Sequence, residues 1–181
     1  ATLNASNAAA TINKANATVT ANSSTVTYNG QTQTVSGFTA SGLVNGETVA
    51  VLNNVSTSGG SGKNVGSYTL SASGSDTNYN LSFVDGGLTI NKATVSLSGI
   101  SKTYDGTTGK GNTTLSISGV NGETLSLGDA TYSSKDVASN GSNYLAALTL
   151  ADNGSYLASN YQVPATLNAS NAAATINKAN A

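Results

Sequence analysis

The sequence predicts a mainly β fold with little helix, built as two tandem small β-rich domains. Apolar and polar residues alternate along much of the chain, which is the period of a strand with one buried face. Asn-Gly and Asp-Gly pairs separate the alternating runs, and such pairs favour tight turns. An ordered series of short motifs occurs twice, which indicates two related domains in tandem.

Strands are expected wherever apolar residues are spaced by two with Thr or Ser between or beside them, because β-branched Thr and Val also favour extended backbone. In chain order, these segments surround Val19, Val26 to Tyr28, Leu81 to Phe83, Leu88 to Ile90, Val95 to Leu97, Leu115 to Ile117, Leu125 to Leu127 and Leu148 to Leu150. Turns are expected at Asn29, Asn45, Asp85, Asp105, Asn121 and Asn153, each followed by Gly. The best helix candidate is the short apolar stretch 43–52, which could hold one or two turns.

The repeated motifs define the expected domain boundaries. Tyr28-Asn29-Gly30 recurs as Tyr104-Asp105-Gly106, and Asn45-Gly46-Glu47-Thr48 recurs from Asn121-Gly122 onward, both after 76 residues. Thr-Ile-Asn-Lys-Ala occurs three times, which places Lys14, Lys92 and Lys178 at domain junctions. Residues 1–17 are identical to residues 165–181. We therefore expect residues 1–17 to be the tail strand of a preceding repeat or a linker, followed by domains over 18–93 and 94–181.

The composition argues against several classes of function. Formal net charge is −1, so no basic stripe is available for nucleic acid, and no apolar run is long enough for membrane insertion. The chain has no Cys and no His, which removes the commonest nucleophile–base pairs, and its eight acids are scattered. We therefore expect no catalytic site and no cofactor.

Two weaker site hypotheses remain open at this stage. Asp105 with Asp129 or Asp136 would form an irregular calcium site if folding brought them together, although no 12-residue calcium loop occurs. The simpler interpretation of such acids beside glycine is that their side chains stabilise turns. Tyr28 and Tyr104 could stack on sugars, but a tyrosine at the core edge with a hydrogen-bonded hydroxyl is the favoured interpretation.

The motif series resembles a known group of repeats. Residues 27–32, Ser41-Gly42-Leu43 and residues 65–68 are similar to the MBG repeat, and residues 102–108 with 132–137 are similar to the YDG repeat. Such repeats occur in large secreted bacterial adhesins related to filamentous haemagglutinin, which are exported by two-partner secretion. The resemblance implies a β-grasp-like fold for each domain, with an Ig-like β-sandwich as the alternative, and a location outside the cell or on the bacterial surface.

The function expected from motif and resemblance is a structural stalk repeat of a secreted adhesin or extracellular filament. It would give reach and cohesion in adhesion or biofilm formation. Its partners would be neighbouring repeats of the same chain or further copies in a filament, with surface glycans as a further class. The alternative is a carbohydrate- or mucin-binding module, which would show exposed aromatic side chains.

Overall fold

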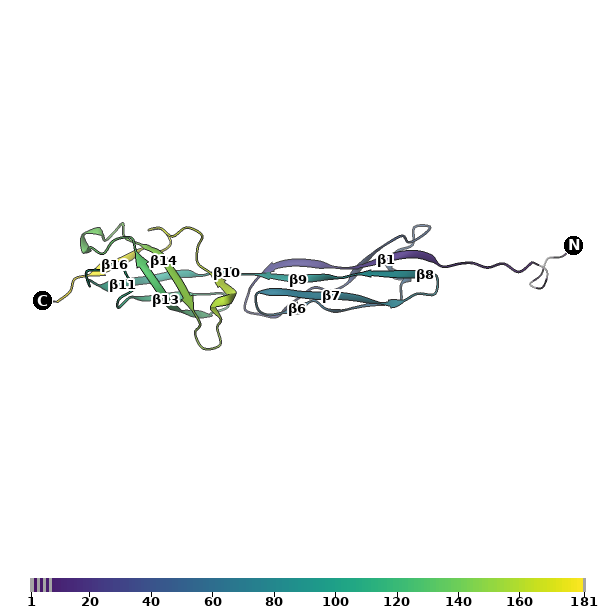
Figure 1. Ribbon diagram of the computed structural model, residues 1–181, viewed down its shortest axis with the longest axis horizontal. Helices are drawn as coiled ribbons and strands as arrows, with labels where there is room; N and C mark the ends of the chain where they lie inside the picture. The colour runs from purple at the N-terminus through teal and green to yellow at the C-terminus, as the bar shows by residue number, and fades with distance from the viewer. Residues whose placement is uncertain (1, 3, 5, 7, 181) are drawn as a thin grey trace. The chain divides into compact units, whose positions relative to one another are not determined.

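The computed structural model describes residues 2, 4, 6 and 8–180, and it confirms the mainly β prediction. The chain divides into two compact units. Unit 1 comprises Ala1–Thr25, Gln33–Gly62 and Ser67–Thr89, and unit 2 comprises Val26–Thr32, Lys63–Gly66 and Ile90–Ala181. Figure 1 labels the main strands of both units.

Unit 1 is built from three small sheets. The first has the order β4 (Phe38–Ser41), β1 (Ala15–Ala21), β8 (Tyr79–Val84), in which β1 runs parallel to β8 and antiparallel to β4. The second has the order β2 (Ser23–Thr27), β9 (Gly86–Asn91), β7 (Gly66–Ser75), β5 (Asn54–Gly59), and β3 (Gln33–Thr34) pairs with β6 (Ser61–Gly62). The ends of β2, β7 and β9 fall in the residue ranges of unit 2. The apolar stretch 43–52 contains one short 3-10 turn, Val49–Val51.

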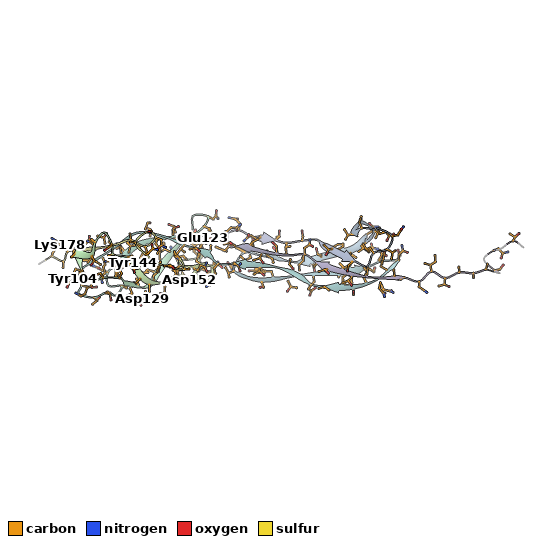
Figure 2. The ribbon with its side chains drawn as sticks, turned by 90° about the horizontal axis from the view of Figure 1, so that it is seen from above. Tyr104, Glu123, Asp129, Tyr144, Asp152 and Lys178 are labelled. Atoms are coloured by element: carbon orange, nitrogen blue, oxygen red, sulfur yellow. The ribbon has the colours of Figure 1, made fainter. Side chains whose placement is uncertain are left out.

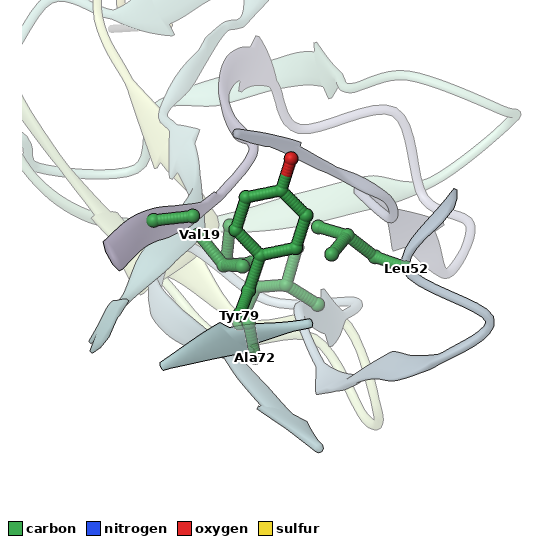
Figure 3. Close-up of a cluster of buried hydrophobic side chains, with 7 residues drawn as sticks. Val19, Leu52, Ala72 and Tyr79 are labelled. Atoms are coloured by element: carbon green, nitrogen blue, oxygen red, sulfur yellow. The ribbon is translucent and has the colours of Figure 1, made fainter. Parts of the chain in front are cut away.

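The core of unit 1 is small because many of its inward side chains are alanines. Its buried members are Ala17, Val19, Ala21, Leu52, Leu70, Ala72 and Tyr79. The strict alternation of buried and less buried residues along β1 confirms that one face of this strand meets the core. Figure 3 shows the ring of Tyr79 beside Val19, Leu52 and Ala72.

Unit 2 contains a larger sheet. Its order is β14 (Leu145–Ala151), β13 (Thr124–Tyr132), β12 (Thr114–Ser118), β11 (Ser96–Thr103), β16 (Ala174–Asn177). A two-stranded parallel sheet joins β10 (Ala93–Thr94) to β15 (Tyr161–Gln162), and two short 3-10 turns cover Val137–Ser139 and Ala158–Asn160. Because β11 also runs parallel to β16, each unit pairs an early strand with a late one in parallel.

The repeated Asn-Gly pairs form the same turn in each unit. Backbone φ is 53° at both Asn45 and Asn121, and it is 74° at Gly46 and 75° at Gly122. Positive φ at both central residues defines a type I′ turn, for which Asn-Gly is the preferred pair. The residue that follows each turn is a glutamate.

The segment 1–17 is described only in part, because residues 1, 3, 5 and 7 lie outside the described residues. Residues 8–14 form no strand and are exposed, whereas Ala15–Ala17 begin β1. Ile12 is 96% exposed, while its counterparts Ile90 and Ile176 in the same motif are each 1% exposed. Within the described part of the chain, no helix has the length and apolar character that a membrane span requires.

The packing of unit 1 predicts a large effect of shortening Leu70, which is 1% exposed. Leu70→Ala is expected to lower the free energy of unfolding by about 2–5 kcal/mol, because the change leaves a cavity among residues that cannot collapse to fill it. Denaturant unfolding followed by circular dichroism measures this. Val84→Ala, at a half-exposed position of the same unit, is the control, and equal effects of the two changes would contradict the assigned core.

Candidate functional site

A buried carboxylate is the most unusual polar feature of unit 2. Glu123 is only 4% exposed, and it ends the type I′ turn that contains Asn121 and Gly122. Two backbone hydrogen bonds fix its position: its N–H donates to the Val120 carbonyl at 2.9 Å, and its carbonyl accepts from the Gly119 N–H at 2.8 Å. The turn therefore fixes the backbone from which the Glu123 side chain extends, and the packing of unit 2 buries that side chain.

Two tyrosines satisfy the Glu123 carboxylate. The Tyr161 hydroxyl donates to Oε2 at 2.7 Å, and the Tyr28 hydroxyl lies 2.9 Å from Oε1 and 3.0 Å from Oε2. The two rings meet edge to face, with centroids 5.3 Å apart. The Val120 N–H donates to the Tyr161 hydroxyl at 3.1 Å, so that oxygen is both donor and acceptor. We call Tyr28, Glu123 and Tyr161 the tyrosine–glutamate joint.

The electrostatics of the joint keep both phenols protonated. Burial raises the pKa of Tyr28 to about 12, and the hydrogen bond to Glu123 adds to the effect. Burial and the same carboxylate also raise the pKa of Tyr161. A protonated phenol can donate and a carboxylate can only accept, so the three groups are complementary.

The backbone of the Tyr28 loop is fixed by hydrogen bonds and by a close approach to the turn that carries Glu123. The Tyr28 N–H donates to the Asn91 carbonyl at 2.8 Å, and the Gln31 N–H donates to Asn29 Oδ1 at 2.9 Å. Gly30 has φ of 79°, and a Cβ there would lie 3.0 Å from the Cβ of Asn121. Both the backbone conformation and the close approach therefore require glycine at this position.

Unit 1 contains a glutamate and a tyrosine that correspond to Glu123 and Tyr161, but among its described residues no second tyrosine binds the glutamate. The Tyr79 hydroxyl donates to Glu47 Oε2 and accepts from the Val44 N–H at 3.0 Å. The bond to Glu47 is the main cause that raises the pKa of Tyr79. Glu47 is exposed, unlike Glu123, and it lines an open pocket of about 370 Å³ together with Asn78 and Tyr79.

The second Tyr-x-Gly loop lies at the end of unit 2 opposite Glu123 (Figure 2). The Tyr104 N–H donates to the Asn177 carbonyl at 2.8 Å, but its side chain is 39% exposed. Lys178 lines the same shallow pocket as Tyr104. The ring of Tyr104 lies 5.9 Å from the Lys135 Nζ.

A buried lysine supports this second loop from below. Lys102 is 2% exposed, and its Nζ donates to Asp105 Oδ1 at 2.8 Å, to the Thr107 carbonyl at 2.9 Å and to the Gly109 carbonyl at 2.8 Å. These three acceptors use all three protons of the ammonium group. The contact with Lys102 is the main cause that lowers the pKa of Asp105 to about 2.

The residues of the calcium hypothesis have separate partners in the structure. Asp105 binds Lys102, Asp129 Oδ1 accepts from the Ala130 N–H at 2.8 Å, and Asp136 Oδ1 lies 3.1 Å from the Lys135 Nζ. Among the described residues, no group of three or more His, Cys, Asp or Glu side chains could hold a metal ion.

The three lysines of the Thr-Ile-Asn-Lys-Ala motif all have exposed side chains. Lys14 donates from Nζ to the Asp76 carbonyl at 2.7 Å, a contact within unit 1. Lys92 and Lys178 follow the buried isoleucines of β9 and β16 by two residues.

Sequence reasoning missed the central residue of the site. Glu47 and Glu123 stand inside the recurring Asn-Gly-Glu-Thr motif, yet only its Asn and Gly were selected, as turn formers. The signal that could have found these glutamates is that an acid recurs at the same place between the Tyr-x-Gly motif and the Asn-Tyr motif in both halves of the sequence. Lys102 was also missed, because a lysine within an alternating segment is ordinarily assigned to the solvent face.

The tyrosine–glutamate joint predicts how stability depends on alkaline pH. The Tyr28 phenol ionises near pH 10 in the unfolded chain and near pH 12 in the folded one, so its contribution is complete below pH 10 and is lost as the pH rises to 12. In Tyr28→Phe, the fall of unfolding free energy with pH in this range should be shallower by about 1.4 kcal/mol per pH unit. Tyr156→Phe, at an exposed tyrosine, is the control, and identical slopes for wild type and Tyr28→Phe would refute the assignment.

The Lys102 site predicts an effect in acid. The pKa of Asp105 is lower in the folded protein than in the unfolded one, so the stability it contributes is present above about pH 4 and is lost as the pH falls towards 2. Lys102→Met should weaken this acid dependence without removing it, because the Thr107 N–H still donates to Asp105 Oδ1, and it should lower the free energy of unfolding at pH 7 by about 1.5–3 kcal/mol through the lost hydrogen bonds of the buried ammonium. Chemical unfolding at a series of pH values measures both effects. Lys110→Met serves as the control, and an unchanged acid limb in Lys102→Met would contradict the pairing.

Comparison with known families covers nearly the whole chain. Residues 17–89 match the family described as MBG domain (YGX type), and residues 88–179 match the family described as YDG domain. No curated protein and no solved structure gives a significant match. The tripeptide Tyr104-Asp105-Gly106 of the exposed loop lies in the second match. The chain therefore belongs to the YDG domain family, and it carries an MBG domain of the YGX type ahead of its YDG domain.

Proposed function

We propose that this chain is a structural repeat of a secreted bacterial adhesin or extracellular filament, in which it provides reach and cohesion. The observation that carries the proposal is the recurrence of one set of joining parts. A Tyr-x-Gly loop, an Asn-Gly-Glu turn and an Asn-Tyr pair occur once in each half of the sequence, and they assemble around Glu123 in unit 2. Parts that recur in phase suit a molecule that is extended by adding copies.

The way the acidic side chains are used supports a role without catalysis. Of the eight acids in the sequence, six accept hydrogen bonds from backbone N–H groups, from Lys102 or from tyrosine hydroxyls, and Asp136 forms an exposed ion pair with the adjacent Lys135. Asp76, for example, accepts from the Asn78 N–H at 2.7 Å, and Asp152 accepts from the Ala158 N–H at 2.7 Å. Carboxylates bound in this manner stabilise backbone rather than take part in proton transfer to a substrate.

The MBG and YDG domains support the extracellular part of the proposal, because the repeats that this sequence resembles occur in secreted adhesins. Adhesion or biofilm formation would then follow from many weakly interacting copies on one stalk, since linked contacts act at a high effective concentration.

The proposal predicts how size grows with copy number. Proteins with one, two and three copies, joined so that the shared 17-residue peptide is written once at each junction, should lengthen by a constant increment per copy. Small-angle X-ray scattering measures the maximum dimension of each. Copies that collapse into one compact particle would overturn the stalk proposal. Saturable binding on a glycan array that Tyr104→Ala removes would favour the carbohydrate-binding alternative instead.

A further inference from the structure

Unit 1 holds an unfilled counterpart of the tyrosine–glutamate joint. We propose that unit 1 of a second copy of this chain receives the Tyr104 loop of the first copy, with the first-copy Tyr104 hydroxyl donating to the second-copy Glu47 carboxylate beside Tyr79. This inference rests on the proposed function, because it needs copies that follow one another in series. It adds the contact that sets their order and register.

The receiving side in unit 1 has the same geometry as the one around Glu123. In each, an Asn-Gly turn with matching positive φ values presents the glutamate, and a tyrosine hydroxyl binds that glutamate while it accepts a backbone N–H. The backbone donors are Val44 at 3.0 Å and Val120 at 3.1 Å. The difference is the third partner, since Tyr28 fills the space at Glu123, whereas an open pocket of about 370 Å³ borders Glu47.

The entering loop is also the same. The Tyr28 N–H and the Tyr104 N–H each donate to an asparagine carbonyl at 2.8 Å, and the following glycines have φ of 79° and 78°. Tyr28 is 3% exposed and Tyr104 is 39% exposed. A Cβ on Gly30 would meet Asn121, but a Cβ on Gly106 would meet nothing within 4 Å. The Tyr104 loop therefore has the same backbone conformation as the Tyr28 loop, but no surface like the one around Glu123 covers it.

The chain register brings these two parts together. In unit 2, Asn91 holds Tyr28, and Ala93, two residues later, pairs in parallel with Tyr161. In unit 1, Ala15 pairs in parallel with Tyr79 in the same way.

Residues 1–17 are identical to residues 165–181, so Ala15 of a second copy can coincide with Ala179 of the first. Ala179 lies two residues after Asn177, which holds Tyr104. The spacing that delivers Tyr28 to Glu123 therefore delivers Tyr104 to Glu47 of the next copy.

The exposed isoleucine of the first motif agrees with this register. Ile90 and Ile176 are buried in β9 and β16, whereas Ile12 is 96% exposed. If residues 1–17 coincide with residues 165–181 of another copy, then Ile12 occupies the place of Ile176, where that side chain is buried. The same overlap of residues 1–17 with residues 165–181 therefore buries Ile12 and brings Tyr104 to Glu47.

The test is the reactivity of Tyr104 towards tetranitromethane in a two-copy protein that contains the shared 17-residue peptide once between the copies. The second copy carries Tyr104→Phe, so only the first-copy side chain is observed by peptide mass spectrometry. A hydrogen bond to a charged partner should slow its nitration by about tenfold or more relative to the single-copy chain. Tyr28, buried in both proteins, and Tyr156, exposed in both, give the slow and fast references.

Glu47→Gln in the second copy should restore most of the reactivity, while Asp85→Asn, at an acid between β8 and β9 of the same unit, should leave the protection unchanged. Should Glu47→Gln fail to fold, Tyr104→Phe in the first copy supplies the second measurement. It should lower the unfolding midpoint of the two-copy protein but not that of the single chain. Nitration of first-copy Tyr104 at the single-chain rate would overturn the inference. If the maximum dimension grows by a constant increment per copy but first-copy Tyr104 reacts at the single-chain rate, the contact between Tyr104 and Glu47 is refuted and the stalk function is not. If the copies collapse into one compact particle, the proposed function is refuted.

Discussion

The buried Glu123 carboxylate is the constraint on which the arrangement of unit 2 depends. Removing a carboxylate from water is costly unless hydrogen bonds replace the lost hydration, and here two tyrosine hydroxyls do so. Tyr28 comes from a segment 95 residues away in the sequence. The acid therefore makes the fold of residues 90–181 dependent on the short segment 26–32, because without Tyr28 the charge would be buried with half of its partners.

The difference between Asn29 and Asp105 follows from what lies beneath each loop. Both side chains accept a hydrogen bond from the backbone N–H two residues later, so either residue can form the turn. Only the second loop lies over a buried lysine, Lys102, and the corresponding position of the first loop is Val26. A carboxylate is needed where it must compensate that charge, and an amide is sufficient where the residue beneath is apolar.

Sequence reasoning found several strands in which two apolar residues are spaced by two. It missed β7, although the inward Leu70 of that strand is large and 1% exposed, and it missed β5. The pairs around Val19, Leu81 and Leu148 lie in strands as predicted, because Val and Leu make the alternation visible. Strand β5 was not predicted, since its Ser, Thr and Gly residues give no apolar period. The joint could not be derived from one sequence, because the meeting of Tyr28 with Glu123 depends on which strands pair. The recurrence of both motifs was visible, but their contact was not.

A joint made of phenols and a carboxylate fixes the packing of unit 2 through directional contacts. The chain has no histidine, and burial raises the pKa of Tyr28 to about 12, so the donors of the joint stay protonated throughout the neutral range. If Tyr28 left its place in unit 2, Glu123 would stay desolvated with half of its partners, which penalises incorrect packing more strongly than the hydrogen bonds reward correct packing. An apolar contact of the same area would tolerate many partners and many rotations. The polar joint admits few, because the hydroxyls of Tyr28 and Tyr161 must both reach the Glu123 carboxylate.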